Sequence, residues 1–268
     1  MFPAPIPYLS TFTVLDFEVW VLVLVRVSIL VFMLPVIGAS SVSPTIKAGL
    51  SALLSFVIYP TLPPLEIPPS SSVPQLVFLA FQESAVGILI GTVSTVVFMA
   101  LTMSGRLIDF ITGFSMAQSF NPLTDESESV MGQIQVALFS LLLLVTGGHL
   151  VFVEALAESF QAIPPLAAHI HMDMVLQVTL SLLGTCFIYG IKLAAPMLIP
   201  LLLTTVGLAI VARIMPQMNV WLVGMPLKIF MGLGIFSLAL PLIWSVYRMH
   251  MQGIQNHIPL MFKALGAN

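Results

Sequence analysis

Charged residues are scarce in this sequence. Asp, Glu, Lys and Arg make up 7% of its 268 residues, whereas hydrophobic residues make up 59%. So little polar surface cannot cover a water-soluble globule, and the chain is therefore predicted to be an integral membrane protein in contact with lipid or to lie in an equally apolar assembly. The net charge of −3 is small and scattered along the chain, so no nucleic-acid partner is expected.

Cysteine is nearly absent as well, since Cys186 is the one cysteine of the chain. A single thiol excludes an internal disulfide and any metal or haem site built from several cysteines. His149 and Glu154 do not have metalloprotease spacing, and His169 and His171 would lie on nearly opposite sides of a helix. Gly-x-Ser-x-Gly, His-Glu-x-x-His and paired-aspartate motifs are also missing. The sequence therefore predicts no catalytic site, no cofactor and no metal site.

Long apolar segments dominate what is present. They cover residues 19–36, 73–101, 130–145 and 175–212, together with the stretch that follows Pro226. Several segments reach or exceed the roughly 20 residues that span a bilayer as a helix, and none alternates between apolar and polar residues as a barrel strand does. The sequence thus predicts an all-α fold of the integral-membrane type.

Glycine and proline divide these segments into broken helices. Gly147 and Gly148 predict a bend or a hairpin between two half-helices. Pro196 and Pro200 predict that residues 174–212 form a hairpin or a kinked pair.

A single membrane domain over residues 1–268 follows from these segments. Its expected parts are N-terminal helices (18–62), a long helix with a loop (73–121), a broken helix pair (125–163), C-terminal helical hairpins (174–247) and a tail (248–268). Asp125 and Glu128 are expected to cap the helix that begins near Val130. The last helix is expected to end near Tyr247.

Four charges lie inside or at the start of apolar runs: Arg26, Glu83, Lys192 and Lys228. In hydrocarbon a charge is costly unless it meets a partner or water, so these side chains are expected to face protein or a conduit. Lys228 follows a helix start, where a cation opposes the helix dipole, and it therefore calls for an anionic partner. A carboxylate on another subunit and a lipid phosphate both satisfy that requirement.

One face of the segment 73–104 carries small and polar residues at helical spacing: Ala80, Glu83, Gly87, Gly91 and Ser94. The glycines lack side chains, so another helix can approach closely there. This face is predicted to pack against a helix that shelters Glu83.

The segment from Arg106 to Asn121 is short and mixes polar residues with Phe110, Phe114 and Met116. Irregular backbone at membrane depth survives only when it is buried in protein or lines a cavity. A re-entrant loop is therefore predicted. The residues alone leave ordinary packing and a sealing role equally open for the bulky side chains.

The order of several short motifs resembles a known family. These motifs are Gly113-Phe-Ser-Met-Ala, Asn121-Pro122, Gly132-Gln133, Gly148-His149, Ser159-Phe160, Ile163-Pro164, Pro216-Gln-Met-Asn-Val220 and Gly224-Met-Pro-Leu-Lys-Ile229. As a set they are similar to the FliR family of flagellar biosynthetic proteins, which includes the homologous export-gate subunits of injectisomes. The form of the last motif looks more like the flagellar branch.

This resemblance implies a subunit of the type III protein export gate in the bacterial inner membrane, at the flagellar basal body. The implied partners are FliP and FliQ in a helical hetero-oligomer, FlhB and FlhA nearby, and unfolded flagellar proteins as export substrates. In the family, helical hairpins stack around a central channel, and a loop at this position of the chain plugs the closed pore.

By this position, the implied plug segment is residues 110–121. Its candidate residues are Phe110, Gly113, Phe114, Met116, Phe120 and Asn121. The residues expected in helix or subunit packing are Glu83, Gly87, Gly91, Lys192, Arg213 and Lys228. A structural and pore-gating role is the favoured function.

An ion- or proton-coupled secondary transporter is the alternative. In that case Glu83, Asp109 and Lys192 would act as relay groups beside broken helices. It would also predict an internal repeat, which the sequence does not show convincingly.

Overall fold

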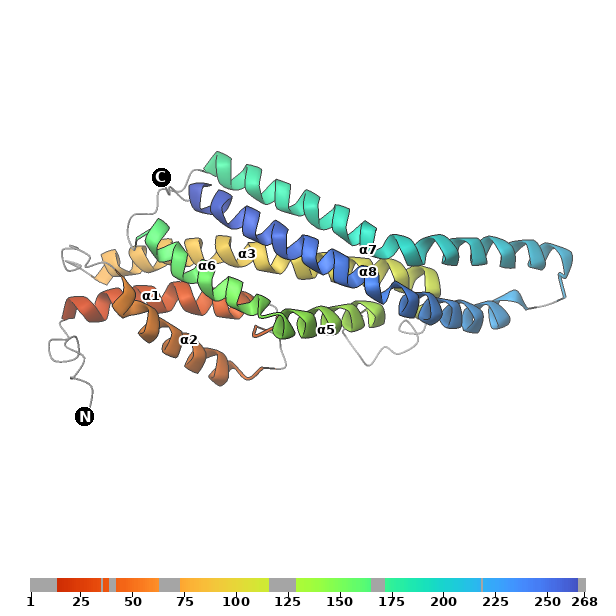
Figure 1. Ribbon diagram of the computed structural model, residues 1–268, viewed down its shortest axis with the longest axis horizontal. Coiled ribbons are helices and arrows are strands. Elements are labelled where there is room, and N and C mark those ends of the chain that lie inside the picture. Colours follow the sequence, from red (N-terminus) through yellow and green to blue (C-terminus); the bar gives the residue numbers. More distant parts are fainter. Residues whose placement is uncertain are drawn as a thin grey trace. The chain divides into compact units, whose positions relative to one another are not determined.

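The computed structural model describes residues 14–34, 36–38, 42–62, 73–115, 129–164, 172–217 and 219–264, and within these ranges it contains helices and no strand (Figure 1). The helices are α1 (Val14–Met33), α2 (Pro44–Ile58), the short 3₁₀ helix η2 (Tyr59–Thr61), α3 (Val73–Thr112), α5 (Val130–Val145), α6 (Gly148–Ala162), α7 (Met172–Ile214) and α8 (Val220–Ala264). The prediction of an all-α fold is confirmed.

The break at Gly147 and Gly148 is present as predicted. Gly147 has a φ of 71°, a left-handed conformation that favours glycine. The chain bends by 71° between α5 and α6 at this break.

The prediction that a loop begins at Arg106 is wrong, because α3 continues to Thr112. Gly105, Ile108, Asp109 and Thr112 are all buried, at the spacing of one helical face. This face packs into the protein and keeps the segment helical although it contains polar residues. The prediction of a loop over residues 106–121 did not take this helical spacing of buried residues into account.

Two other helix boundaries also differ from the predictions. Of the two arrangements predicted for Pro196 and Pro200, the hairpin is wrong, because α7 runs through both prolines as one helix, and a kinked helix is the alternative that remains. Prolines are tolerated in apolar helices of this length when neighbouring groups compensate the lost hydrogen bonds. The last helix does not end near Tyr247: α8 continues to Ala264, and Ile258, Met261 and Phe262 are buried in its final turns.

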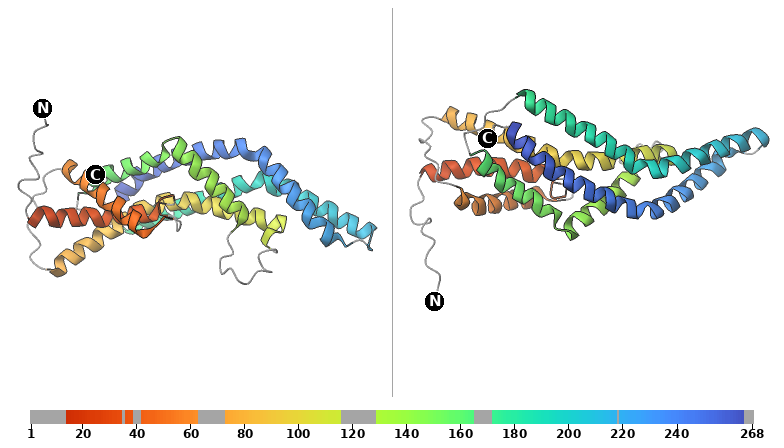
Figure 2. Two further views of the ribbon diagram at one scale, coloured as in Figure 1. Left: turned by 90° about the horizontal axis from the view of Figure 1, so that it is seen from below. Right: turned by 45° about the horizontal axis from the view of Figure 1, so that its top comes forward.

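The chain divides into two compact units, which are described separately. Unit 1 comprises residues 1–95, 149–180 and 254–268, and unit 2 comprises residues 96–148 and 181–253. The helices α3, α7 and α8 each continue from one unit into the other (Figures 1 and 2). The sequence-based division into five consecutive parts remains a prediction about the domain.

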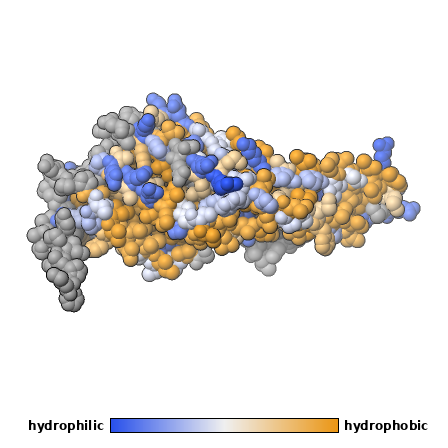
Figure 3. All heavy atoms as spheres, viewed as in Figure 1, coloured by the Kyte–Doolittle hydropathy of each residue, from blue (hydrophilic) through white to orange (hydrophobic). Residues whose placement is uncertain are grey.

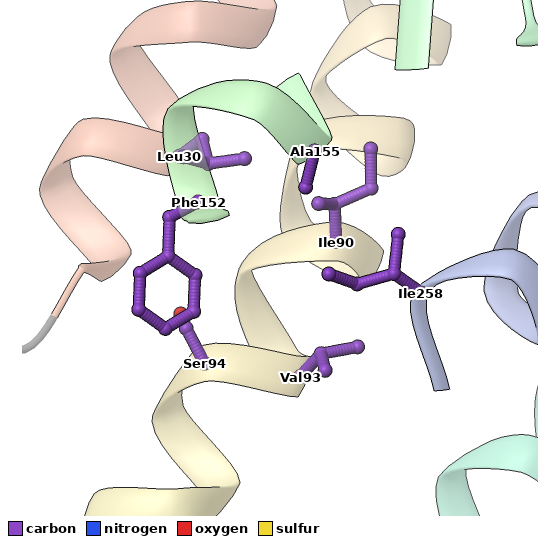
Figure 4. A pocket seen from close by; sticks show the side chains of 7 residues that line it. All are labelled: Leu30, Ile90, Val93, Ser94, Phe152, Ala155 and Ile258. Carbon is purple, nitrogen blue, oxygen red and sulfur yellow. The ribbon is translucent and has the colours of Figure 1, made fainter. Parts of the chain in front are cut away.

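Unit 1 has an aliphatic and aromatic core supplied by α1, the first half of α3, α6 and the end of α8. The core surrounds a void of only about 10 Å³, lined by Leu30, Ile90, Val93, Ser94, Phe152, Ala155 and Ile258 (Figure 4). The Ser94 hydroxyl donates a 2.7 Å hydrogen bond to the Gly91 carbonyl within its own helix. The void therefore offers a water too few polar partners, and it is a packing defect rather than a ligand site.

Helix α2, also in unit 1, buries polar residues and exposes apolar ones, the reverse of a surface helix in a soluble protein. Its polar residues Lys47, Ser51 and Ser55 are buried. Its exposed side carries Ile46, Leu53, Phe56 and Val57, which are 55–62% exposed. Because water would disfavour this arrangement, the outer side of α2 is built for lipid or for an apolar protein partner.

The 3₁₀ helix after α2 is tied to the first turn of α1. The Tyr59 hydroxyl donates a 2.6 Å hydrogen bond to the Asp16 carboxylate. Burial raises the pKa of Tyr59, and the neighbouring Asp16 carboxylate raises it further. Tyr59 therefore stays neutral and keeps this hydrogen bond throughout the physiological pH range.

Unit 2 is organised by aromatic and glycine contacts between helices. Phe98 of α3 packs edge-on against Phe139 of α5, with ring centroids 5.3 Å apart, and Phe139 meets Tyr247 of α8 at 5.0 Å. The Tyr247 hydroxyl forms a hydrogen bond with the Thr146 hydroxyl at the end of α5. These contacts fix α8 to α5 next to the Gly147 break.

By length and composition, α3, α7 and α8 could each cross a membrane, and the bent pair α5 and α6 could supply a fourth span. In the most apolar window of each helix, only 17% of α7 and 22% of α8 is buried, against 59% of α3. Figure 3 shows apolar residues over much of the visible face. The described part of the chain therefore leaves a large apolar surface that lipid or other subunits must cover.

Alanine at Gly105 is expected to destabilise the protein by about 1–3 kcal/mol, because the added Cβ would overlap the backbone of the facing helix. It would lie 2.1 Å from the Gly132 nitrogen, where α3 crosses α5. Alanine at Gly49 is the matched control, because nothing lies within 4 Å of its Cβ position on α2. Thermal unfolding in mild detergent, followed by far-UV circular dichroism, measures both. Equal unfolding temperatures for the two variants would contradict the close crossing.

Candidate functional site

A hollow of about 320 Å³ lies in unit 2, where the end of α3 meets the second half of α7 and the beginning of α8. Its walls are mostly apolar. The lining residues are Phe110, Ile111, Thr112, Gly113, Thr205, Leu208, Ala209, Val220, Trp221, Gly224, Met225 and Lys228.

Glycines shape two sides of the hollow. Gly113 ends α3 with a φ of 90°, and its N–H donates to the Asp109 carbonyl at 3.0 Å. A side chain at this φ would be strained, so glycine is the residue that allows the chain to turn here. Gly224 lets α8 approach α7, since a Cβ there would lie 3.0 Å from Leu208 Cδ1.

Lys228 is the one charged residue among those that line the hollow. It is half-buried, and among the described residues no carboxylate lies within ion-pair distance of its ammonium group. The part of unit 2 that the structure describes holds five cationic residues (Arg106, Lys192, Arg213, Lys228 and Arg248) and one acidic residue, Asp109, which is buried. The hollow is therefore a mostly apolar site whose Lys228 has no counter-ion among the described residues.

Two expected plug residues, Phe110 and Gly113, line the same hollow as Lys228. Phe110 is 77% exposed, and Phe114 is half-buried in the helical turn that follows Gly113. The expected plug residues Met116, Phe120 and Asn121 lie outside the described residues, as do Asp125 and Glu128.

Lys192 and Arg213 do not line this hollow. Lys192 is exposed on α7, with its ammonium 5.6 Å from the centre of the Tyr189 ring. Arg213 is exposed in the last turn of α7, where a cation interacts favourably with the helix dipole. Both side chains are accessible to a partner outside the chain.

A second polar centre, in unit 1, surrounds Arg26. This side chain is 0% exposed, and its Nε donates a 2.6 Å hydrogen bond to Glu83 Oε2 on α3, which is 1% exposed. Its Nη1 donates to the carbonyls of Ser159 and Ile163, each at 3.1 Å. The guanidinium also lies 4.3 Å from the centre of the Phe160 ring. Arg26 thus joins α1 to α3 and to the C-terminal end of α6.

The expected packing residues Glu83, Gly87 and Gly91 all face α1 of the same chain. A Cβ at Gly87 would lie 3.1 Å from the Arg26 carbonyl oxygen, and a Cβ at Gly91 would lie 2.9 Å from Met33 Cβ. The glycines therefore bring α1 and α3 close enough for the Arg26–Glu83 pair to form. The pairing of Arg26 with Glu83, and the Ser159 and Ile163 carbonyls, were not identified from sequence. The sequence feature that could have predicted this pair is the presence of one cation and one anion, Arg26 and Glu83, in two separate apolar segments.

Asp109 connects α3 to α5 in unit 2. One carboxylate oxygen accepts the Met131 N–H at 3.2 Å, and the Ser129 hydroxyl accepts the Gly132 N–H at 2.8 Å. Ser129 is the N-cap of α5, so the prediction that Asp125 and Glu128 cap this helix is wrong. The buried Asp109 of α3 thus supplies an acceptor at the N-terminus of α5.

Comparison of the sequence with known proteins identifies its family. The profile of "Bacterial export proteins, family 1" matches residues 17–254. The chain belongs to this family.

Several known proteins are similar in sequence to this chain over most of their length. The chain is 28% identical to the flagellar biosynthetic protein FliR of Bacillus subtilis, over 87% of this chain and 90% of that protein. It is 32% identical to FliR of Aquifex aeolicus, over 85% and 87%. It is also 28% identical to the Yop proteins translocation protein T of Yersinia pestis, over 68% and 70%. The resemblance inferred from the motifs is confirmed.

The family match includes both polar centres of this export protein. Arg26, Glu83, the end of α3 and Lys228 all lie within residues 17–254. Among the described residues, no group of three or more His, Cys, Asp or Glu side chains is placed to hold a metal ion. The chemistry of the two centres is that of ion pairing and apolar packing.

Removing one partner of the buried pair, as in Glu83→Gln or Arg26→Met, is expected to destabilise unit 1 by about 3–5 kcal/mol, because the other charge is left buried and unpaired. The double variant Arg26→Met/Glu83→Leu should recover a large part of that loss. Thermal unfolding in detergent and the yield of folded protein are the measurements. Single variants as stable as the wild type would contradict the proposed role of the pair.

Proposed function

We propose that this chain is a structural and pore-gating subunit of the flagellar type III protein export apparatus in the bacterial inner membrane. The observation that carries the proposal is the family match over residues 17–254, together with relatives that are named FliR along nearly their whole length. The similarity to a Yop translocation protein supports a role in protein export rather than in flagellar structure alone.

The physical character of the helices supports a place within a larger assembly. Helices α7 and α8 are long, apolar and mostly unburied, and α2 turns its apolar side outward. Lys192 and Arg213 stand on exposed positions of α7, where a bilayer alone would leave them uncompensated. We therefore propose contacts with FliP and FliQ in a helical hetero-oligomer, with FlhB and FlhA nearby.

We propose that the plug segment, residues 110–121, occludes the closed channel through which unfolded flagellar proteins are exported. Phe110 is largely exposed at the end of a rigid helix, and Phe114 follows the Gly113 turn. Flexible Met and Phe side chains seal irregular contours and can be displaced without breaking specific bonds. Met116 and Phe120 complete this set in the sequence.

A transporter based on Glu83 is less well supported. The Glu83 carboxylate is held by Arg26 at 2.6 Å and is buried with it, which suits a structural ion pair better than a group that exchanges protons. The export role is therefore the proposed function.

Deleting residues 113–119 is expected to make the closed gate leak ions, because the bulky side chains that occlude it are removed or displaced. The measurement is the membrane potential of cells that carry the variant, reported by a potential-sensitive dye. A deletion of equal length within residues 63–72 is the control and should leave the potential unchanged.

Co-purification with FliP and FliQ must accompany this experiment, since a chain that fails to assemble cannot leak. Phe110→Ala with Phe114→Ala is the milder variant if the deletion prevents assembly. An assembled deletion variant with a normal membrane potential would contradict the plug.

A further inference from the structure

We propose that the hollow at the end of α3 binds the headgroup phosphate of an anionic phospholipid, with Lys228 as the cation that recognises it. The inference rests on unit 2 alone and does not depend on the export function. It assigns to Lys228 a lipid ligand within the protein, in place of a carboxylate from another subunit.

The first argument is the charge of the site. Lys228 is half-buried among apolar walls that include Leu208 and Met225, and the described part of unit 2 supplies it with no carboxylate. A partly desolvated ammonium group is costly without a counter-ion. A phosphate group would neutralise the charge of the Lys228 ammonium group, and its oxygens would accept hydrogen bonds from that group.

The second argument is the position of Lys228 along its helix. The last turn of α7 carries Arg213, the connection to α8 contains Gln217 and Asn219, and both helices are mostly apolar beyond these residues. Figure 3 shows hydrophilic residues at this end of the α7–α8 pair and apolar residues along its sides. Lys228 lies eight residues after Val220, about 12 Å along α8. That depth is within reach of headgroup phosphates for a lysine side chain that extends toward the membrane surface.

The third argument is the shape and composition of the hollow. Its volume of about 320 Å³ is larger than a phosphate needs and leaves room for the glycerol and the first methylene groups. Trp221, which is 56% exposed, borders it, and tryptophan is enriched at the membrane interface because its ring is apolar and its N–H is a donor. Neighbouring exposed residues of the hairpin, such as Ile210 and Leu222, would lie against the acyl chains.

An anionic lipid fits better than a zwitterionic one. A choline or ethanolamine ammonium group would bring a second positive charge close to Lys228, the one charged residue that lines the hollow. Phosphatidylglycerol carries the same phosphate without that second positive charge. Selectivity for phosphatidylglycerol over phosphatidylcholine is therefore the expected signature.

The test is native mass spectrometry of the full chain, purified with its co-expressed complex in mild detergent and titrated with phosphatidylglycerol or phosphatidylcholine. Lys228→Gln should weaken phosphatidylglycerol binding about five-fold and remove the preference over phosphatidylcholine, the effect expected for one interfacial lysine. Arg248→Gln is the matched control, because it removes an exposed cation of the same unit that does not line the hollow. It should leave the binding unchanged.

A second pair of variants tests the hollow without changing its charge. Ala209→Phe places a ring in the hollow and should also weaken binding, whereas Leu203→Phe, at an exposed position of α7 outside it, should not. If Lys228→Gln fails to fold, the comparison of Ala209→Phe with Leu203→Phe still shows whether the lipid binds in the hollow.

Four results would overturn the proposal. One is unchanged phosphatidylglycerol binding in Lys228→Gln and Ala209→Phe. Another is an equal loss in Lys228→Gln and Arg248→Gln, which would indicate general charge attraction. The third is competition by millimolar inorganic phosphate as strong as that by the lipid, which would make the ligand a free anion. Loss of the complex in Lys228→Gln with lipid binding intact would point instead to a carboxylate of another subunit.

Discussion

The buried ion pair between Arg26 and Glu83 is the interaction on which the organisation of unit 1 depends. Each charge lies in a long apolar helix and would be costly alone in lipid or in a protein core. Together, and with the Ser159 and Ile163 carbonyls as further acceptors, they hold three helices in one arrangement. Apolar packing permits many alignments of α1 on α3, but this pair permits one. Gly87 provides the close approach that the pair requires.

In unit 2 a buried polar contact also holds two helices together, here between a carboxylate of α3 and a backbone N–H of α5. The buried Asp109 carboxylate accepts an N–H at the start of α5, and Gly105 and Gly132 let the two helices cross closely. Beside this fixed contact lies the Gly113 turn, where the plug segment leaves α3. A rigid helix therefore supports the base of the segment to which we assign gating. The positive charge of Lys228 stands in the hollow at that point.

The sequence predicted the helical class and the Gly147 break because both follow from local patterns: long apolar runs and paired glycines. It also predicted that Glu83 and the glycines beside it form a packing face, which the structure places against α1. The pairing of Arg26 with Glu83 is a contact between residues far apart in the chain, and no local pattern specifies it. The extent of α3 was missed because Asp109 is polar, although its partner on α5 makes a buried helical position favourable. Composition could not show that α7 continues as one helix through two prolines.

The exposed apolar surfaces of α2, α7 and α8 support the central claim that this chain is completed by other subunits of an export gate. The most direct measurement compares the chain purified alone with the chain purified after co-expression with FliP and FliQ, using size-exclusion chromatography with light scattering to determine mass. The claim predicts a stable hetero-oligomer on co-expression and aggregation or degradation of the chain alone. A stable, folded monomer that gains no partner on co-expression would contradict it.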